Sequence, residues 1–106
     1  MASAIATFRD ATQWIVDTYP TNPAAVAAGS VYYLKLAGIT FGGWMMLRSA
    51  QVATRQLAAG EGDASYLRGK LDTARFYGDH ILPQATSLAA AMRGADSVLA
   101  AEEALL

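Results

Sequence analysis

The chain has 106 residues, with eight basic and nine acidic side chains and a formal net charge of −1, which leaves too little basic surface for nucleic-acid binding. It contains no cysteine, which excludes disulfides, thiolate catalysis and zinc–thiolate sites. This length predicts one domain over residues 1–106, and because 54% of the residues are hydrophobic and 16% are charged, that domain has more apolar surface than it easily buries.

The first predicted helix is amphipathic and begins near the N-terminus. Ile5, Phe8 and Ile15 recur at helical spacing, and most of the polar residues take the other side. The helix ends before Pro20, which disfavours helical geometry in the residue that precedes it. Asn22, followed directly by a proline, is typical of the cap and first turn of a new helix. A tight helix–helix connection is therefore predicted here.

The second predicted helix is unusually long. From Pro23 to Ala59 there is no proline and no polar cluster, which predicts one helix of roughly 35 residues, about 50 Å at 1.5 Å per residue. The alternative is a break near Gly42 and Gly43, because each glycine in a helix interior costs about 1 kcal/mol relative to alanine. The first two thirds of this helix are apolar nearly all round, so we expect it to be central.

Local signals mark the ends of the remaining helices. Gly60 is a helix C-cap and Asp63 an N-cap, which places the start of a third helix at residue 64. Pro83 predicts a kink or break, after which helical spacing resumes to Gly94, and Asp96 can cap a last short helix. Nothing alternates with period two, so no sheet is expected. The predicted fold class is all-α, an antiparallel bundle of three to four helices with one long central helix.

A membrane-spanning interpretation of the long helix is considered and set aside. Residues 24–47 carry only one charge, Lys35, and are long enough to cross a bilayer. However, this charge lies near the middle, where it costs a few kcal/mol, and the flanks lack a basic cluster. The N-terminus has no basic region followed by an apolar run, so no secretory signal is expected either. We expect a cytoplasmic protein, and a membrane-embedded helical hairpin is the minor alternative.

The sequence offers no self-sufficient active site. His80 is the single histidine, with Asp79 beside it, but general-base or metal chemistry needs further partners that the pattern does not supply, so we favour a structural role near the proline break. Glu102 and Glu103 are adjacent and cannot both face one substrate atom. The glycines around Glu61 lack the lysine of a phosphate loop. We predict no catalytic, cofactor-binding or metal-binding residue.

Three stretches together resemble a known family. They are Val31-Tyr-Tyr-Leu-Lys-Leu-Ala-Gly-Ile-Thr-Phe-Gly-Gly-Trp-Met-Met, Leu57-Ala-Ala-Gly-Glu-Gly-Asp and Lys70-Leu-Asp-Thr-Ala-Arg-Phe-Tyr-Gly-Asp-His-Ile-Leu-Pro. The chain resembles the C-terminal helical domain of bacterial acyl-CoA dehydrogenases, in the branch of methylmercaptopropionyl-CoA dehydrogenase-like enzymes. The last stretch is the most specific part of the likeness.

The resemblance implies a parent flavoenzyme that oxidises an acyl-CoA thioester across its α,β carbons, with FAD as hydride acceptor and a carboxylate as base. Those parts lie in segments that precede this domain, so no catalytic or FAD-binding residue is carried onto this chain and no activity is expected from it alone. The implied function is a non-catalytic domain that stabilises the dehydrogenase body, shapes a dimer interface or covers part of the acyl-CoA cleft. The rival hypothesis is a stand-alone helical oligomerisation scaffold.

Docking is therefore the function to which individual residues can be assigned. The expected partners are the dehydrogenase body, a second copy of the chain in a homo-oligomer, or both. The long helix combines large apolar side chains with glycines that let another backbone approach closely. The candidate interface residues are Tyr32, Tyr33, Gly38, Phe41, Gly42, Trp44 and Met45, with Gly43 beside them.

Overall fold

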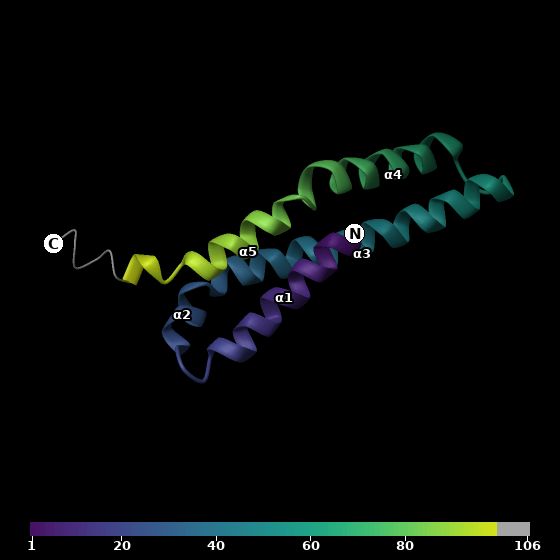
Figure 1. The fold of residues 1–106 in the computed structure, drawn as a ribbon. Coiled ribbons are helices and arrows are strands. Elements are labelled where there is room, and N and C mark those ends of the chain that lie inside the picture. Colours follow the sequence, from purple (N-terminus) through teal and green to yellow (C-terminus); the bar gives the residue numbers. More distant parts are fainter. Residues whose placement is uncertain (100–106) are drawn as a thin grey trace.

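A computed structural model describes residues 1–99, and nearly all of them are helical (Figure 1). The α-helices in that range are α1 (Ala2–Thr18), α2 (Pro23–Ala28), α3 (Ser30–Ala59), α4 (Ala64–Phe76) and α5 (Gln84–Gly94), with a short π-helix, η1 (Tyr77–Ile81), between the last two. No strand occurs among these residues. The all-α fold class and its long helix are confirmed.

The long helix α3 is the axis on which the other helices pack. Its 30 residues span about 45 Å. Helices α1 and α5 lie against one half of α3, while α4 folds back along the other half (Figure 1). The molecule is elongated as a result, with extents of 64 × 28 × 15 Å. Each half of α3 is therefore covered by different helices.

Side-chain and glycine caps form where the sequence predicts them. The Asn22 carboxamide oxygen accepts a hydrogen bond of 3.2 Å from the Ala25 backbone N–H at the start of α2. The Asp63 carboxylate accepts one of 3.0 Å from the Ser65 N–H at the start of α4. Gly60 ends α3 in the left-handed conformation, with φ of 70°. These local signals act through the first or last turn of each helix, so neighbouring residues suffice to encode them.

The predicted helix from Pro23 to Ala59 is wrong at one point, because it is divided at Gly29. This residue lies at the edge of the right-handed helical region, with φ of −87° and ψ of −2°, and separates α2 from α3. A Cβ there would lie 2.7 Å from the Met92 carbonyl oxygen of α5, so the backbones of the two segments meet at this position. The alternative break at Gly42 and Gly43 is also wrong, since α3 runs through both without interruption.

The predicted break at Pro83 is confirmed and takes the form of a widened turn. The Leu82 N–H donates to the Tyr77 carbonyl at 3.0 Å, an i→i+5 bond that defines η1. Because Pro83 has no N–H, it cannot continue the regular ladder, and α5 starts at the next residue. The Gln84 side-chain amide donates to the His80 carbonyl at 3.0 Å and satisfies one carbonyl of this turn.

Of the predicted last helix, the structure shows only the beginning. Residues 97–99 are helical after a turn at Ala95 and Asp96, and the Ser97 hydroxyl donates to the Gly94 carbonyl at 2.8 Å. The rest of that prediction, together with Glu102 and Glu103, lies outside the described residues.

The core is thin and made mostly of small side chains between α1, α3 and α5. Leu36 and Met92 are its largest fully buried members, and four alanines complete it: Ala4, Ala11, Ala85 and Ala89. The Thr40 hydroxyl, which is buried, donates to the Leu36 carbonyl at 2.8 Å. Phe8 and Ile15 pack against this core as expected, whereas Ile5 is 47% exposed. Alanine faces let helices approach closely but leave the larger apolar side chains around the rim.

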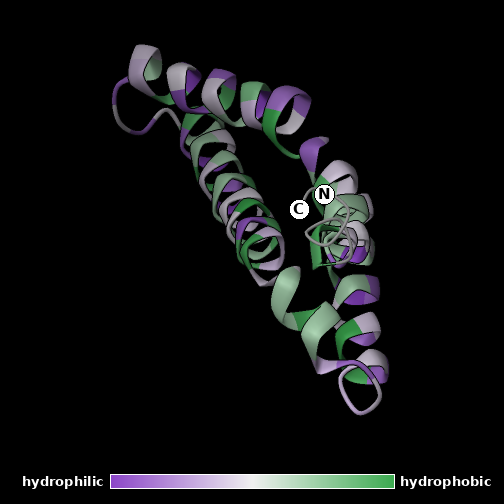
Figure 2. Ribbon diagram, turned by 90° about the vertical axis from the view of Figure 1, so that its left-hand side faces the viewer, coloured by the Kyte–Doolittle hydropathy of each residue, from purple (hydrophilic) through white to green (hydrophobic). Residues whose placement is uncertain are grey.

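Hydropathy differs between the two arms of the α3–α4 hairpin. Figure 2 shows α3 with more hydrophobic residues and α4 with a larger share of hydrophilic ones. Within the described residues, no helix combines the length and the apolar character that crossing a bilayer requires.

Candidate docking surface

A stripe of apolar residues runs along α3 on the side away from the buried Leu36. Its members are three, four or seven residues apart, which keeps them on one helix face. The most exposed are Leu34 at 72%, Phe41 at 61%, and Val31 and Met45 at 58% each. We call this set the α3 stripe, and it consists of Val31, Leu34, Gly38, Phe41, Met45 and Val52. Such spacing is typical of a helix that packs against a second helix.

An apolar groove adjoins the stripe between α1 and α3. It measures about 330 Å³ and is lined by Met1, Ile5, Phe8, Thr40, Phe41 and Trp44. Phe41 belongs to both features, and its ring meets the Phe8 ring edge-on with centroids 5.7 Å apart. Trp44 is 49% exposed, and the Arg48 guanidinium lies 5.7 Å from the centre of its ring. A large apolar side chain from a partner has room to enter here.

The structure divides the seven candidate interface residues into two groups. Tyr32, Gly38, Phe41, Trp44 and Met45 are exposed, whereas Tyr33 and Gly42 take part in packing within the chain. The ring of Tyr33 stacks on Phe8 at 5.4 Å, and its hydroxyl shares a hydrogen bond of 2.7 Å with the Thr12 hydroxyl. Five of the seven therefore lie where a partner has access.

The glycines of α3 lie in two different environments. A Cβ at Gly42 would clash with the Tyr77 hydroxyl, and one at Gly43 would lie 2.7 Å from a methyl group of Leu82. Around Gly38 there is nothing within 4 Å of that position. Tyr77 of η1 and the neighbouring Leu82 therefore occupy the space that Gly42 and Gly43 leave on α3. The space beside Gly38, in the middle of the α3 stripe, is open.

Tyr77 is the residue whose role the sequence did not reveal. Its hydroxyl donates a hydrogen bond of 2.7 Å to the Ile39 carbonyl of α3, across the gap that Gly42 leaves. Burial raises the pKa of this phenol above its ordinary value of 10.0. The adjacent glycines Gly42 and Gly43 are the signal that the sequence offers for this contact, and it is ambiguous, because glycine pairs also mark helix breaks.

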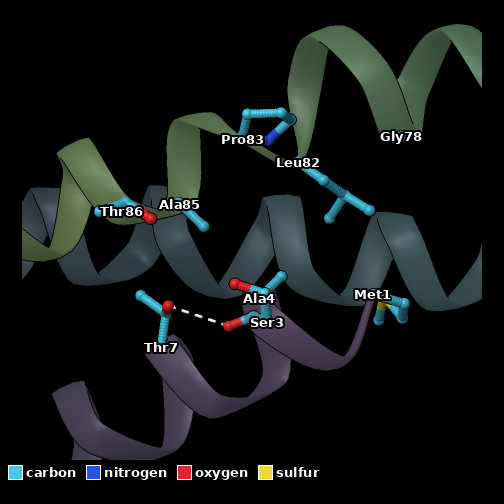
Figure 3. Close-up of a pocket in the computed structure, with 9 residues that line it drawn as sticks. All are labelled: Met1, Ser3, Ala4, Thr7, Gly78, Leu82, Pro83, Ala85 and Thr86. Carbon is cyan, nitrogen blue, oxygen red and sulfur yellow. Dashed lines mark hydrogen bonds between the residues drawn. The ribbon is translucent and has the colours of Figure 1, made fainter.

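The chemistry-bearing residues do not converge on a site. Among residues 1–99, no group of three or more His, Asp or Glu side chains is placed to hold a metal ion. His80 is exposed, and its ring packs against Phe76 with centroids 4.6 Å apart. The hollow beside Pro83 measures about 340 Å³ (Figure 3). Its nine lining residues include three hydroxyl side chains, Ser3, Thr7 and Thr86, but no titratable side chain that could activate one of them as a nucleophile.

The described residues do not fit a flavin either. FAD needs backbone donors aimed at its pyrophosphate and a wall that stacks on its ring system. The left-handed glycines, Gly60 and Gly62, form the exposed tip of the α3–α4 hairpin. Trp44 lies sixteen residues before Gly60 on the same helix, about 24 Å away, so donors and aromatic wall are not brought together. We assign no flavin contact to residues 1–99.

Comparison with known proteins gives two matches. A family model described as "Acetyl-CoA dehydrogenase C-terminal like" matches residues 1–102. The chain is also similar to 3-methylmercaptopropionyl-CoA dehydrogenase of Ruegeria pomeroyi (strain ATCC 700808 / DSM 15171 / DSS-3), with 33% identity over 87 residues. That alignment covers 82% of this chain and 15% of the relative, so the chain spans a small part of that protein's length. No solved structure matches.

Proposed function

The chain belongs to the acetyl-CoA dehydrogenase C-terminal-like family, and from this premise we propose that it is the non-catalytic helical domain of an acyl-CoA dehydrogenase-like flavoenzyme. In this proposal the domain packs through α3 against the catalytic body or a second copy of the chain. Acyl-CoA oxidation and the FAD that it requires belong to the body. Residues 1–99 bring no group of three or more metal-ligating side chains together, and packing is the role proposed here.

The exposed α3 stripe is the observation that carries the proposal. Fully burying a large aliphatic or aromatic side chain contributes about 1.5–3 kcal/mol. Leu34, Phe41 and Met45 each keep more than half of their surface in water, at 72%, 61% and 58%. Covering these three and their neighbours would contribute on the order of 5 kcal/mol before the cost of ordering the partner. Burial of the α3 stripe against a partner is therefore energetically favourable.

The shape of this surface favours packing or oligomerisation over covering the acyl-CoA cleft. A straight helix with apolar residues three and four apart fits another helix, since the side chains interdigitate along its length. Gly38 at the centre of the stripe leaves room for a partner backbone or a large side chain to come close. A cover over a nucleotide thioester would instead need several cationic groups toward the phosphates, whereas the members of the stripe are apolar and Arg48, at its edge, packs on the Trp44 ring.

Photo-crosslinking in cells of the source organism tests the proposal. A benzoylphenylalanine in place of Phe41 reports what touches the stripe, and the same group in place of Asp72, on the exposed side of α4, is the matched control. We expect irradiation of the Phe41 variant to join the chain to peptides of an acyl-CoA dehydrogenase catalytic region. A crosslink to another copy of the chain supports the proposal only if the crosslinked assembly also contains an acyl-CoA dehydrogenase catalytic region; an assembly without that region favours the scaffold hypothesis instead.

A further inference from the structure

The C-terminal half of the α3 stripe, from Met45 to Val52, is bordered by basic residues from two helices. We propose that the partner segment that covers this half carries carboxylates beside an apolar anchor side chain, and that it is not the α3 stripe of a second copy. The use of the stripe as a docking surface rests on the proposed function. The chemistry of the partner segment rests on a hollow and on the charges around it.

A hollow of about 430 Å³ opens beside this half of the stripe, where α4 packs along α3. Met45 and Val52 line it together with Leu67, the buried residue of α4. Tyr66, which is 62% exposed, also lines it. All nine lining residues belong to α3 and α4, so two packed helices form the whole hollow. An apolar side chain from a partner would fill it and cover Met45 and Val52, which are 58% and 42% exposed.

The charged residues that line this hollow are both basic, Arg48 from α3 and Lys70 from α4. Arg55 follows Arg48 by seven residues, so the two lie on the same side of α3. Arg48 lies 5.7 Å from the centre of the Trp44 ring, and Lys70 lies 5.3 Å from that of the Tyr66 ring. No acidic residue stands three or four positions from Arg48 or Lys70 on its own helix. These cations are therefore available to carboxylates of a partner.

The same charges argue against the stripe of a second copy as the occupant. Between Asp17 and Glu61 the sequence contains three basic residues and no acidic one, and α2 and α3 lie within that interval. Helix α4 adds three basic residues and one acidic residue, Asp72, which does not line the hollow. Two copies packed stripe on stripe would place the basic residues of α3 against each other or against uncharged residues of α2 and α3. Like charges across an interface weaken it, and unpaired charges add no affinity.

A protein segment fits this surface better than the other polyanions that basic residues attract. Nucleic acid needs rows of phosphate contacts, and the two cations of the hollow with Arg55 are too few. An anionic bilayer covers a broad apolar face, whereas this surface is hollowed and its lining includes Ser49 and Gln56. One anchor side chain between carboxylates matches both the volume of the hollow and the charge of its lining.

Two synthetic peptides measure this binding on the full chain. Both are stapled 15-residue helices with the same leucines along one face, flanked by glutamate in the first and by glutamine in the second. We expect fluorescence anisotropy to show about tenfold tighter binding of the glutamate peptide at low salt, as two or three exposed ion pairs would give, with a smaller difference at high salt. Chemical-shift changes should centre on Met45, Val52 and Leu67.

Two double variants with the same change in net charge locate the effect. Arg48→Gln with Lys70→Gln removes the two cations that line the hollow. Arg9→Gln with Arg68→Gln removes two exposed cations that do not line it and is the matched control. The first variant should bind both peptides equally, and the control should keep the preference for glutamate. Equal binding by the parent chain, the same loss in both variants, or shifts centred elsewhere would each overturn the proposal.

The remaining outcomes distinguish the occupants and separate this inference from the proposed function. A dimer of the parent chain that Met45→Glu dissociates would show that a second copy covers the stripe, which would overturn the inference. So would an RNA oligomer or phosphatidylglycerol vesicles that bind the chain while the glutamate peptide does not. Because the peptides contain no dehydrogenase sequence, their failure leaves the proposed function to the crosslinking experiment.

Discussion

Replacing Gly42 by alanine tests the contact that joins η1 to the long helix. The added methyl group would clash with the Tyr77 hydroxyl and lie 3.2 Å from the ring carbon that carries it. Tyr77 must move, and its hydrogen bond of 2.7 Å to the Ile39 carbonyl breaks. That bond contributes about 0.5–1.5 kcal/mol, and overpacking adds about 1–3 kcal/mol. The higher helix propensity of alanine offsets about 1 kcal/mol of this, so we expect the free energy of unfolding to fall by about 1–3 kcal/mol.

Gly38→Ala is the matched control on the same helix. Nothing lies within 4 Å of its added methyl group, so only the propensity gain of about 1 kcal/mol applies. Urea unfolding followed by circular dichroism gives the free energy of unfolding of both variants against the parent chain. The two should differ by about 2–4 kcal/mol with opposite signs. If Gly42→Ala is stabilised as much as Gly38→Ala, the approach of Tyr77 to α3 is not as described.

Three further predictions concern burial and exposure. The raised pKa of Tyr77 means that the folded state favours the neutral phenol, so the stability that this gives is complete below the ordinary pKa of 10.0 and is lost as pH rises through the folded pKa. Tyr77→Phe should lower the free energy of unfolding by about 1 kcal/mol at neutral pH. In urea titrations over a pH series, the variant should also lose less stability at alkaline pH than the parent chain. Gly29→Ala should lower stability by about 1–3 kcal/mol, measured the same way, because its methyl group would lie 2.7 Å from the Met92 carbonyl oxygen; an unchanged midpoint would contradict this. Leu34→Glu with Met45→Glu should leave stability within about 0.5 kcal/mol, since both side chains are exposed, yet should weaken docking in a size measurement of the native assembly; unchanged assembly would remove the α3 stripe from the interface.

Helix ends were predictable because their signals are local. Asn22, Gly60 and Asp63 act on backbone groups within one turn, and Pro83 acts through its own missing N–H. The division at Gly29 was not predictable in the same way, because the backbone that Gly29 contacts, at Met92 of α5, is more than sixty residues further along the chain. Tertiary contacts of this kind leave no pattern in the neighbouring sequence.

The exposure of the candidate docking residues on the long helix was predictable only in part. A helix that is apolar nearly all round does not reveal which side other helices cover. Tyr32 and Tyr33 are adjacent and chemically identical, yet Tyr33 stacks on Phe8 and Tyr32 is 37% exposed, because α1 lies on one side of α3 only. The same one-sided coverage leaves Leu34 exposed, although the apolar composition of the helix around Leu34 predicts a central helix.

The central claim is that this helical domain works as part of an acyl-CoA dehydrogenase-like flavoenzyme. The most direct measurement is to add an affinity tag to the chain at its native locus, purify it under mild conditions, and determine bound flavin from visible absorbance together with the mass of the assembly from light scattering. We predict about one FAD for each copy of the domain, in an assembly much larger than the 11.2 kDa chain. Flavin-free protein of a size that the chain alone explains would contradict the account.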